Sequence, residues 1–295
     1  MKLREIGEFG LIERVAKRAG GGGEGVVVGV GDDAAVFKPS RGSLTVATTD
    51  ALIEKVHFDL SKASFRSVGR KALCSNISDC VSMGARPRHF LVTIALPSRV
   101  SVAQVDELYD GMLSLARKYR ISLAGGDTVS SPGPIVISIT LLGEVKKKNL
   151  MLRSGARPGD LICVTGKLGD PRFGLGRYPR VREALSIAES RLATSMIDNS
   201  DGLARCLIEI CRMSRVGARV DVSRIPLAST LDLALYGGED YELVFTVPGS
   251  RLKKLPKKCA VIGEITRISG GIKLIYDSGR EKNIKSGGYQ HFDDQ

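Results

Sequence analysis

Aspartates recur in this sequence at the ends of short runs of apolar or small residues. Four such places are Val30-Gly31-Asp32-Asp33, Val46-Ala47-Thr48-Thr49-Asp50, Ala124-Gly125-Gly126-Asp127 and Met196-Ile197-Asp198-Asn199-Ser200-Asp201. Carboxylates placed where strands end are well suited to holding hard divalent cations against phosphate groups. The pattern therefore indicates metal-dependent phosphate chemistry.

The motifs of the first half each leave a second interpretation open. Thr48-Thr49-Asp50 supplies three oxygen ligands, but the same residues also form turns or helix caps. Asn76 and Asp79 lie one turn apart in a predicted helix of otherwise apolar residues, where an unpaired carboxylate is costly and a cation partner is one solution. Gly125-Gly126-Asp127 permits close approach of a ligand to the backbone, or forms a simple turn.

Two acidic stretches mark the second half. The stretch from Asp198 to Asp201 precedes a predicted helix, so Ser200 or Asp201 could be its N-cap, but two acids three residues apart exceed what capping requires. Residues 237–242 place three acids and a tyrosine before a strand. This composition suits contact with a polar ligand more than packing.

Residues 29–34 match the pattern Gly-x-Gly-x-x-Ala of dinucleotide-binding folds. A Rossmann loop needs a helix after the glycines, whereas residues 34–37 are strand-like and Pro39 closes them. We therefore favour a metal-binding turn, with a solvated tight turn as the alternative. Because Walker A and protein-kinase signatures are absent, any phosphate would have to be held by carboxylate-bound metals.

Composition limits the class of protein. The 295 residues are 43% hydrophobic and 26% charged, enough for two domains with substantial cores. No apolar run approaches the length of a membrane helix and the first residues lack a signal-peptide core, so we expect a cytoplasmic protein without a membrane partner. The six cysteines form no Cys-x-x-Cys pair, which favours reduced, mostly buried thiols over a zinc site.

The net charge of +12 raises the question of nucleic-acid binding. The lysines and arginines are spread along the chain, and 5% aromatic residues with no tryptophan leave little material for stacking bases. Solvated surface charge is the favoured interpretation. The three histidines, His57, His89 and His291, are interpreted as structural groups or substrate contacts rather than general bases.

Hydrophobic periodicity predicts two successive sets of strands and helices. The first set has helices near residues 9–19, 64–83 and 102–119, and strands near 26–30, 34–37, 44–48, 90–96 and 135–142. After a lysine-rich linker at 146–149, the second set has strands near 161–165, 194–197, 218–222, 242–247 and 260–265, and helices near 181–189, 203–213 and 231–236. We expect two mixed α/β domains, residues 1–148 and 149–295.

Taken together, the motifs resemble those of the thiamine-monophosphate kinase family, in the superfamily of aminoimidazole ribonucleotide synthetase, selenophosphate synthetase and the hydrogenase maturation factor HypE. The resembling stretches in the first half are 29–34, 48–50 with His57-Phe58, 76–79 with 83–85, and 125–128. In the second half they are 153–156 with Gly159-Asp160, 165–170, 198–203, 237–243 and 288–292. They run in order over nearly the whole chain, and His57-Phe58 and the Gly-Gly-Glu-Asp-Tyr-Glu-Leu string distinguish this kinase from its superfamily relatives.

The resemblance implies an α/β (α+β) fold of the aminoimidazole ribonucleotide synthetase-like type. The N-terminal domain would bind ATP and metal and pair its sheet with that of a second copy in a homodimer, and the C-terminal domain would complete the active site. The implied reaction is the last step of thiamine diphosphate biosynthesis, in which the γ-phosphoryl group of ATP passes directly and in line to thiamine monophosphate with the help of several Mg²⁺ ions.

The resemblance also assigns a role to individual residues. The implied metal ligands are Asp33, Thr48, Thr49, Asp50, Asp79, Asp127, Asp198 and Asp201. ATP would be contacted by Tyr109, Gly126, Asp127, Arg153 and Ser200, and thiamine monophosphate by His57, Glu239 and Tyr289. Asp198, Asp201 and Arg153 are the catalytic candidates, Arg153 through a forked contact with a phosphate.

The sequence departs from the family pattern in three places. Asn199 stands where an apolar residue is usual, Ser82 replaces a common alanine, and residues 170–181 compress a longer helical segment with its proline-arginine motif. The alternatives to this kinase are another small-molecule ATP enzyme of the same superfamily and a non-catalytic protein that binds nucleotides or nucleic acid.

Overall fold

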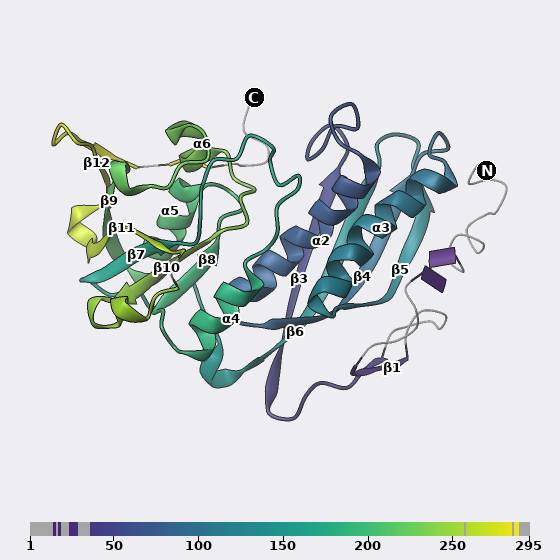
Figure 1. Ribbon diagram of the computed structural model, residues 1–295, viewed down its shortest axis with the longest axis horizontal. Coiled ribbons are helices and arrows are strands. Elements are labelled where there is room, and N and C mark those ends of the chain that lie inside the picture. Colours follow the sequence, from purple (N-terminus) through teal and green to yellow (C-terminus); the bar gives the residue numbers. More distant parts are fainter. Residues whose placement is uncertain are drawn as a thin grey trace. The chain divides into compact units, whose positions relative to one another are not determined.

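The chain folds into two compact units, each built around its own sheet. The structure, a computed structural model, describes residues 14, 15, 17, 18, 24–28, 36–256, 258–284 and 286–288. One unit comprises Met1–Cys80 with Arg86–Lys147, and the other Val81–Ala85 with Lys148–Gln295 (Figure 1). Helices and strands alternate in both, which confirms the predicted mixed α/β class.

The first unit contains a four-stranded sheet in its described part. Its strands lie in the order β3 (Ser43–Ile53), β6 (Val136–Lys146), β4 (Arg86–Leu96) and β5 (Ser122–Ser130). β4 and β5 are parallel and the other pairs are antiparallel. A separate short pair, β1 (Val26–Val28) and β2 (Val36–Phe37), is antiparallel. The parallel pair needs a crossover, which α3 (Val102–Tyr119) provides between β4 and β5.

α2 (Phe65–Ser82) and α3 lie next to each other on one face of this sheet (Figure 1). α3 begins with a capping box, in which Ser101 and Gln104 each accept a backbone hydrogen bond from the other. The two helix backbones approach very closely, because a Cβ added to Gly111 would stand 2.0 Å from the carbonyl oxygen of Arg66. Glycine is therefore required at this crossing.

The second unit contains a seven-stranded sheet in its described part, in the order β13-β12-β9-β11-β7-β10-β8. The strands are β7 (Asp160–Val164), β8 (Ser195–Asp198), β9 (Val216–Asp221), β10 (Leu243–Pro248), β11 (Ala260–Arg267), β12 (Ile272–Ile275) and β13 (Glu281–Asn283). The helices are α4 (Val181–Glu189), α5 (Leu203–Ser214) and α6 (Leu231–Tyr236), with short 3-10 turns at Val222–Arg224, Gly249–Lys254 and Ile268–Gly270. A further 3-10 turn, Lys147–Asn149, spans the point along the chain where the first unit ends and the second continues.

The central strands of this sheet are buried on both faces. Leu207 and Ile210 of α5 pack in one core with Val164, Val244 and Ile262. The alternate residues Cys163, Met196 and Phe245 are paired across the strands and are also fully buried. Strands buried on both faces have near-continuous apolar sequences, which explains why β7, β8 and β10 were predictable.

The predicted helices at 102–119, 181–189 and 231–236 are confirmed with the same bounds. The prediction that Asp50 ends a strand is wrong, because β3 continues to Ile53. The turn considered at Gly125-Gly126-Asp127 is also wrong, since these residues lie inside β5. β5 is an edge strand of small and polar residues, so it carries almost no hydrophobic signal and forms through pairing with β4.

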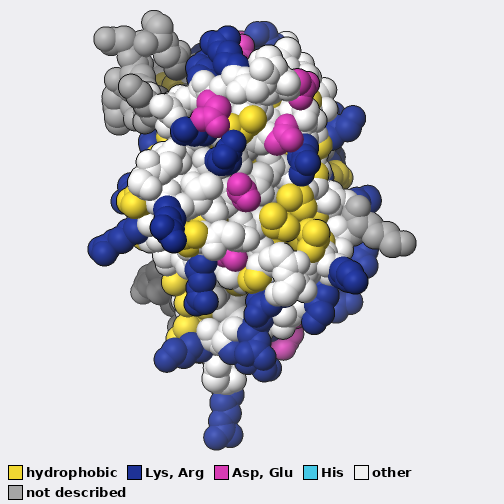
Figure 2. All heavy atoms as spheres, turned by 90° about the vertical axis from the view of Figure 1, so that its left-hand side faces the viewer, with side chains coloured by type: hydrophobic (Ala, Val, Ile, Leu, Met, Phe, Trp, Pro, Cys, Tyr) yellow, Lys and Arg dark blue, Asp and Glu magenta, His cyan; other side chains and the backbone are white. Residues whose placement is uncertain are grey.

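Two further expectations concern cysteines and charge. The six cysteines are free, and five of them are buried, as predicted. On the face shown in Figure 2, lysines and arginines are dispersed with acidic side chains between them. Within the described ranges, no helix combines the length and the apolar composition needed to cross a bilayer.

Candidate active site

In the first unit, a polar cluster forms where β3 meets α2. Thr48 and Asp50 alternate with Thr49 along the strand and face the helix. Thr48 Oγ1 donates a 2.8 Å hydrogen bond to Asp79 Oδ2, and the Asp50 carboxylate accepts one from the Ser75 hydroxyl. The predicted ligands Thr48, Asp50 and Asp79 are thus brought together by one strand and one helix.

Two side chains beside this strand–helix contact, Asp50 and Asn76, have few hydrogen-bond donors in the described part of the chain. Burial raises the pKa of Asp50, and the Ser75 hydrogen bond opposes this shift only in part. Asn76 is fully buried, and while its amide nitrogen donates to the carbonyl of Ala72 at 3.2 Å, its Oδ1 has no partner in the described part of the chain. Buried oxygens that lack donors suit a hard cation.

Thr49 and Asp127 lie apart from this cluster. Thr49 points to the other face of the sheet, where Thr140 Oγ1 is 3.3 Å from its hydroxyl. Asp127 of β5 pairs with Thr93 of β4, Thr93 pairs with Ser138 of β6, and Ser138 pairs with Ala51 of β3, so these four residues form one row across the sheet. Three strand spacings of about 4.8 Å separate the ends of that row. The sheet therefore does not place Asp127 beside Asp50, and its metal role stays a prediction.

The other predicted ligand contacts of this unit are His57, Tyr109 and Gly126, and the structure shows what surrounds each of them. His57 Nδ1 accepts the backbone N–H of Ile53 at 3.0 Å, which leaves the ring proton on Nε2. The ammonium of Lys71 donates to the His57 carbonyl at 2.6 Å. Hydrogen bonds therefore fix both the ring and the backbone of His57. Tyr109 is buried in α3, and this burial raises the pKa of its hydroxyl. Gly126 is required by packing, because its Cβ would stand 2.0 Å from the Val92 carbonyl oxygen.

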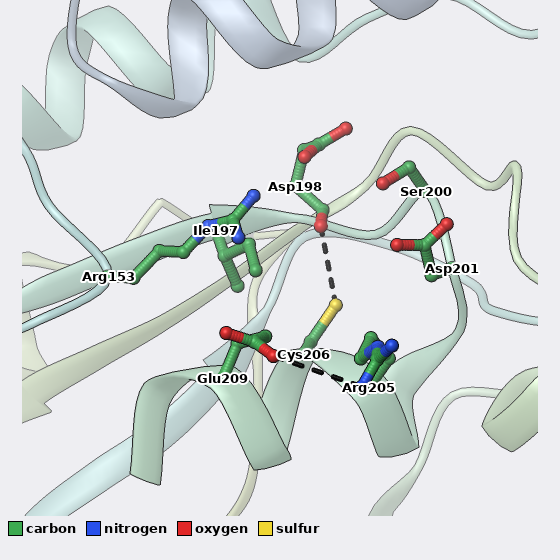
Figure 3. Close-up of a pocket in the computed structure, with 8 residues that line it drawn as sticks. All are labelled: Arg153, Ile197, Asp198, Ser200, Asp201, Arg205, Cys206 and Glu209. Atoms are coloured by element: carbon green, nitrogen blue, oxygen red, sulfur yellow. Dashed lines mark hydrogen bonds and ion pairs between the residues drawn. The ribbon is translucent and has the colours of Figure 1, made fainter. Parts of the chain in front are cut away.

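In the second unit, predicted site residues surround a pocket of about 240 Å³. Asp198 ends β8, Ser200 and Asp201 follow it, and Arg153 lies across from them (Figure 3). The remaining lining residues are Ile197, Arg205, Cys206 and Glu209. The pocket therefore combines two guanidinium groups with carboxylates and a hydroxyl, a set able to bind a phosphate together with a cation.

The helix at the floor of the pocket supplies residues that the sequence did not single out. Arg205 Nη1 lies 3.9 Å from Glu209 Oε1 one turn along α5, and Glu209 also accepts from Arg212 at 2.7 Å (Figure 3 draws the first pair). The Cys206 thiol donates to the Asp198 carbonyl at 3.3 Å, and burial raises its pKa well above the usual value. In the sequence, only the i,i+4 spacing of Arg205 and Glu209 could have indicated that these residues interact, and such pairs also occur on helices that line no pocket.

The alternative that Ser200 or Asp201 caps α5 is wrong. The N-cap is Gly202, which makes no side-chain capping bond. The loop is held instead by its backbone, because the Ser200 carbonyl accepts the N–H of Glu239 at 2.7 Å and the Asn199 carbonyl accepts the N–H of Asp240 at 3.1 Å.

Residues 237–242 are predicted from the sequence to contact a polar ligand rather than to pack in the interior. The structure shows that two of the three acids in this stretch are buried. Asp240 and Glu242 are each 1% exposed, and Tyr241 is also buried. Glu239 alone of the three acids is partly exposed. Burial raises the pKa of Asp240 and of Glu242, and their arginine partners oppose that shift. The three arginines among residues 170–180 could have indicated that these acids are buried, because buried carboxylates need cationic partners.

Several predicted features lie outside the described residues. They are the predicted metal ligand Asp33, the turn residue Asp32, the predicted substrate contact Tyr289, His291, the Gly-x-Gly-x-x-Ala motif at 29–34 and most of the helix predicted at 9–19.

The donor set fits a magnesium ion better than a metal such as zinc. Within the described ranges, no three histidine, cysteine or acidic side chains gather closely enough to hold a metal by themselves. Mg²⁺ is usually bound by one or two carboxylates, with water and substrate phosphates completing its shell. Asp50 with Asp79, and Asp198 with Asp201, are two such pairs.

Comparison with known proteins decides the family. The family models for the N-terminal and C-terminal domains of AIR synthase related proteins match residues 31–145 and 174–273. A thiamine-monophosphate kinase from Bacillus subtilis (strain 168) is 33% identical over 97% of this chain and 99% of its own length. The chain belongs to the thiamine-monophosphate kinase family.

Solved structures of this family share the fold. The thiamine-monophosphate kinase from Stenotrophomonas maltophilia K279a is 31% identical, with a TM-score of 0.79 over 92% of this chain and 96% of that one. A structure described as AaThiL complexed with AMPPCP and TMP is 28% identical, with a TM-score of 0.73 over 99% of both chains. The fold predicted from the resemblance is confirmed.

Proposed function

We infer that the protein phosphorylates thiamine monophosphate to thiamine diphosphate with ATP as phosphoryl donor. Full-length similarity to thiamine-monophosphate kinases carries this conclusion, and the relative bound to AMPPCP and TMP supports both substrates. The pocket of Arg153, Asp198, Ser200 and Asp201 supplies the chemistry that such a transfer needs.

Phosphoryl transfer requires alignment and charge neutralisation more than covalent catalysis. We propose that Arg153 forms a forked contact with a phosphate and that Ser200 donates to a phosphate oxygen. Glu239, His57 and Tyr289 would orient thiamine monophosphate, and Tyr109 and Gly126 would contact ATP. Residues 1–148 would thus carry most of the nucleotide and metal contacts, and residues 149–295 the remaining ligand contacts.

We propose Mg²⁺ as the metal, held by Thr48, Asp50 and Asp79 in the first unit and by Asp198 and Asp201 in the second. Asp33, Thr49 and Asp127 complete the set predicted from the family. When bound, the ions neutralise charge on the phosphate oxygens. The raised pKa of Asp50 supports a cation in the first unit, as does Asn76 Oδ1, which has no hydrogen-bond partner among the described residues.

The function is tested with the purified protein, ATP, thiamine monophosphate and a Mg²⁺ series. We expect thiamine diphosphate to form only when all three are present and to disappear when EDTA is added, as measured by chromatography of the products. Absence of thiamine diphosphate at every Mg²⁺ concentration would sink the proposal. Formylglycinamidine ribonucleotide and selenide, offered in parallel, test the related ATP enzymes, which the comparisons do not favour.

We also propose that the protein is a homodimer. In the first unit, α2 and α3 lie on one face of the four-stranded sheet (Figure 1), and the strand residues that alternate away from them include the partly exposed Leu91, Ala95, Val136 and Leu142. The same face also carries the hydroxyl groups of Thr49, Thr93, Ser138 and Thr140. A face that mixes apolar and hydroxyl side chains suits pairing with an identical face. Sedimentation equilibrium is expected to give twice the chain mass of 31.6 kDa, and a monomer mass at micromolar concentration would contradict pairing.

The cytoplasmic location and the lack of a nucleic-acid partner stay predictions.

A further inference from the structure

The segment between β7 and α4 directs arginines at buried carboxylates. It includes residues 170–180, which belong to the stretch that the resemblance predicts to be compressed relative to the family pattern. Arg180 forms a fork with Glu242, in which Nε donates to Oε2 at 2.6 Å and Nη2 donates to Oε1. Thr165 Oγ1 donates to the same Oε2 at 2.7 Å. The carboxylate of Glu242 is therefore held by three donors in the interior of the second unit.

Arg177 holds the second buried carboxylate. Its Nη2 donates to Asp240 Oδ1 at 2.9 Å, and its Nη1 lies 3.6 Å from Glu242 Oε1. Asp240 also accepts the backbone N–H groups of Gly169 at 2.7 Å and Asp170 at 3.0 Å. The amide of Asn199, the residue that departs from the family pattern, donates to Asp240 Oδ2 at 3.1 Å.

These two carboxylates belong to a turn with an unfavourable backbone. Glu239 has a φ of 54° and Tyr241 a φ of 52°, left-handed conformations that cost a non-glycine residue free energy. At Gly238 a Cβ would stand 2.3 Å from the Ser200 carbonyl oxygen. Such a turn keeps its shape only where surrounding contacts hold it, and the side chain of Asp240 lies between the two left-handed residues.

We infer that Arg177 and Arg180 are positioning residues for the phosphoryl-acceptor site, because they neutralise Asp240 and Glu242 and so hold residues 237–242 in the conformation that presents Glu239. The inference rests on the proposed function, in which Glu239 contacts thiamine monophosphate. Among the proposed ATP contacts, Ser200 is bonded to this turn through the N–H of Glu239, whereas Tyr109 and Gly126 belong to the first unit and Arg153 precedes β7. Loss of an arginine should therefore affect the acceptor more than ATP.

The test compares steady-state kinetics of Arg180→Gln, Arg180→Lys and Arg177→Gln with the wild type. For Arg180→Gln and Arg177→Gln we expect the KM for thiamine monophosphate to rise about tenfold or more, with the KM for ATP changed less than about twofold. Arg180→Lys keeps the charge but not the fork, so its KM should lie between those of wild type and Arg180→Gln. Thermal unfolding followed by circular dichroism reports whether each variant folds.

Arg172→Gln is the matched control. Arg172 comes from the same segment and forms a similar fork with Asp170, whose Oδ2 also lies 3.2 Å from Arg177 Nε. Its side chain is 64% exposed, against 14% for Arg177, and its hydrogen bonds go to Asp170, so Arg177 keeps its contact with Asp240 when Arg172 is replaced. We expect its kinetics to equal those of the wild type.

The inference is overturned if the KM for thiamine monophosphate is unchanged, or if both KM values rise together in step with a lower unfolding temperature. If the glutamine variants do not fold, the inference is tested with Arg180→Lys. A KM of this variant for thiamine monophosphate equal to that of the wild type would then contradict the inference. If wild type and Arg172→Gln form no thiamine diphosphate, the proposed function itself has failed and the inference falls with it. If they are active and the Arg177 and Arg180 variants match them, only the inference fails.

Discussion

Asp198→Asn is expected to lower kcat about 10³-fold while the protein still folds. Asp198 is 2% exposed at the end of β8, and its carboxylate faces the pocket beside Ser200 and Asp201 (Figure 3). Asparagine has the same shape but no charge, so it removes an anionic ligand of the proposed Mg²⁺ with little change in volume. A metal that stabilises a phosphoryl-transfer transition state contributes several kcal/mol, and about 4 kcal/mol corresponds to 10³-fold in rate.

The measurement is kcat for thiamine diphosphate formation at saturating ATP and Mg²⁺, with circular dichroism to check the fold. Asp221→Asn is the matched control, because Asp221 ends β9 in the same unit and its side chain caps the following turn by accepting the N–H of Ser223 at 3.0 Å. We expect full activity and a small loss of stability for this control. A folded Asp198→Asn protein with wild-type kcat would remove Asp198 from the catalytic assignment.

Asp50→Asn is expected to inactivate the enzyme at least about 10²-fold and to stabilise the metal-free protein by roughly 1 kcal/mol. Asp50 shares its cluster with Thr48 and Asp79, and burial raises its pKa. The pKa of the folded state lies above that of the unfolded chain, so the ionised carboxylate costs stability at neutral pH. A neutral amide at this position avoids that cost and also loses the charge that would bind Mg²⁺.

The pH dependence gives the sign of this effect. The extra stability of Asp50→Asn should be largest at neutral pH, shrink as the pH falls through the raised pKa, and vanish below the unfolded value of about 3.9. Urea unfolding at several pH values measures it. Added Mg²⁺ should raise the unfolding temperature of the wild type more than that of the variant. An Asp50→Asn protein that is less stable than wild type at neutral pH without metal would contradict the desolvation argument.

Asp59→Asn is the control of opposite sign. Asp59 follows the same strand, but hydrogen bonds from Lys55 and Ser61 hold its pKa well below the usual range. Its ionised form therefore contributes stability that is present above the unfolded pKa and is lost as the pH falls through the lower folded pKa. We expect Asp59→Asn to be less stable than wild type at neutral pH and to keep its activity.

The sequence by itself determined the family, the α/β class and most of the elements. Helices such as Val102–Tyr119 and Val181–Glu189 have an apolar stripe and clear ends, and strands such as Leu243–Pro248 are buried on both faces, so local periodicity predicts them. The order of the acidic motifs along the chain, joined to His57-Phe58 and the Gly-Gly-Glu-Asp-Tyr-Glu-Leu string, predicted the kinase family, and the comparison with known proteins confirms it.

Only the tertiary structure decided which acids share a site. Alternation along β3 separates Thr49 from Thr48 and Asp50, and the strand order β3-β6-β4-β5 sets Asp127 far from Asp50. Asp240 and Glu242 lie within three residues of Glu239 in the sequence. Glu239 is partly exposed, whereas Asp240 and Glu242 are buried and form ion pairs with Arg177 and Arg180. The spacing of acids along the chain does not contain this information, because burial and the position of a cationic partner depend on which distant segments pack together.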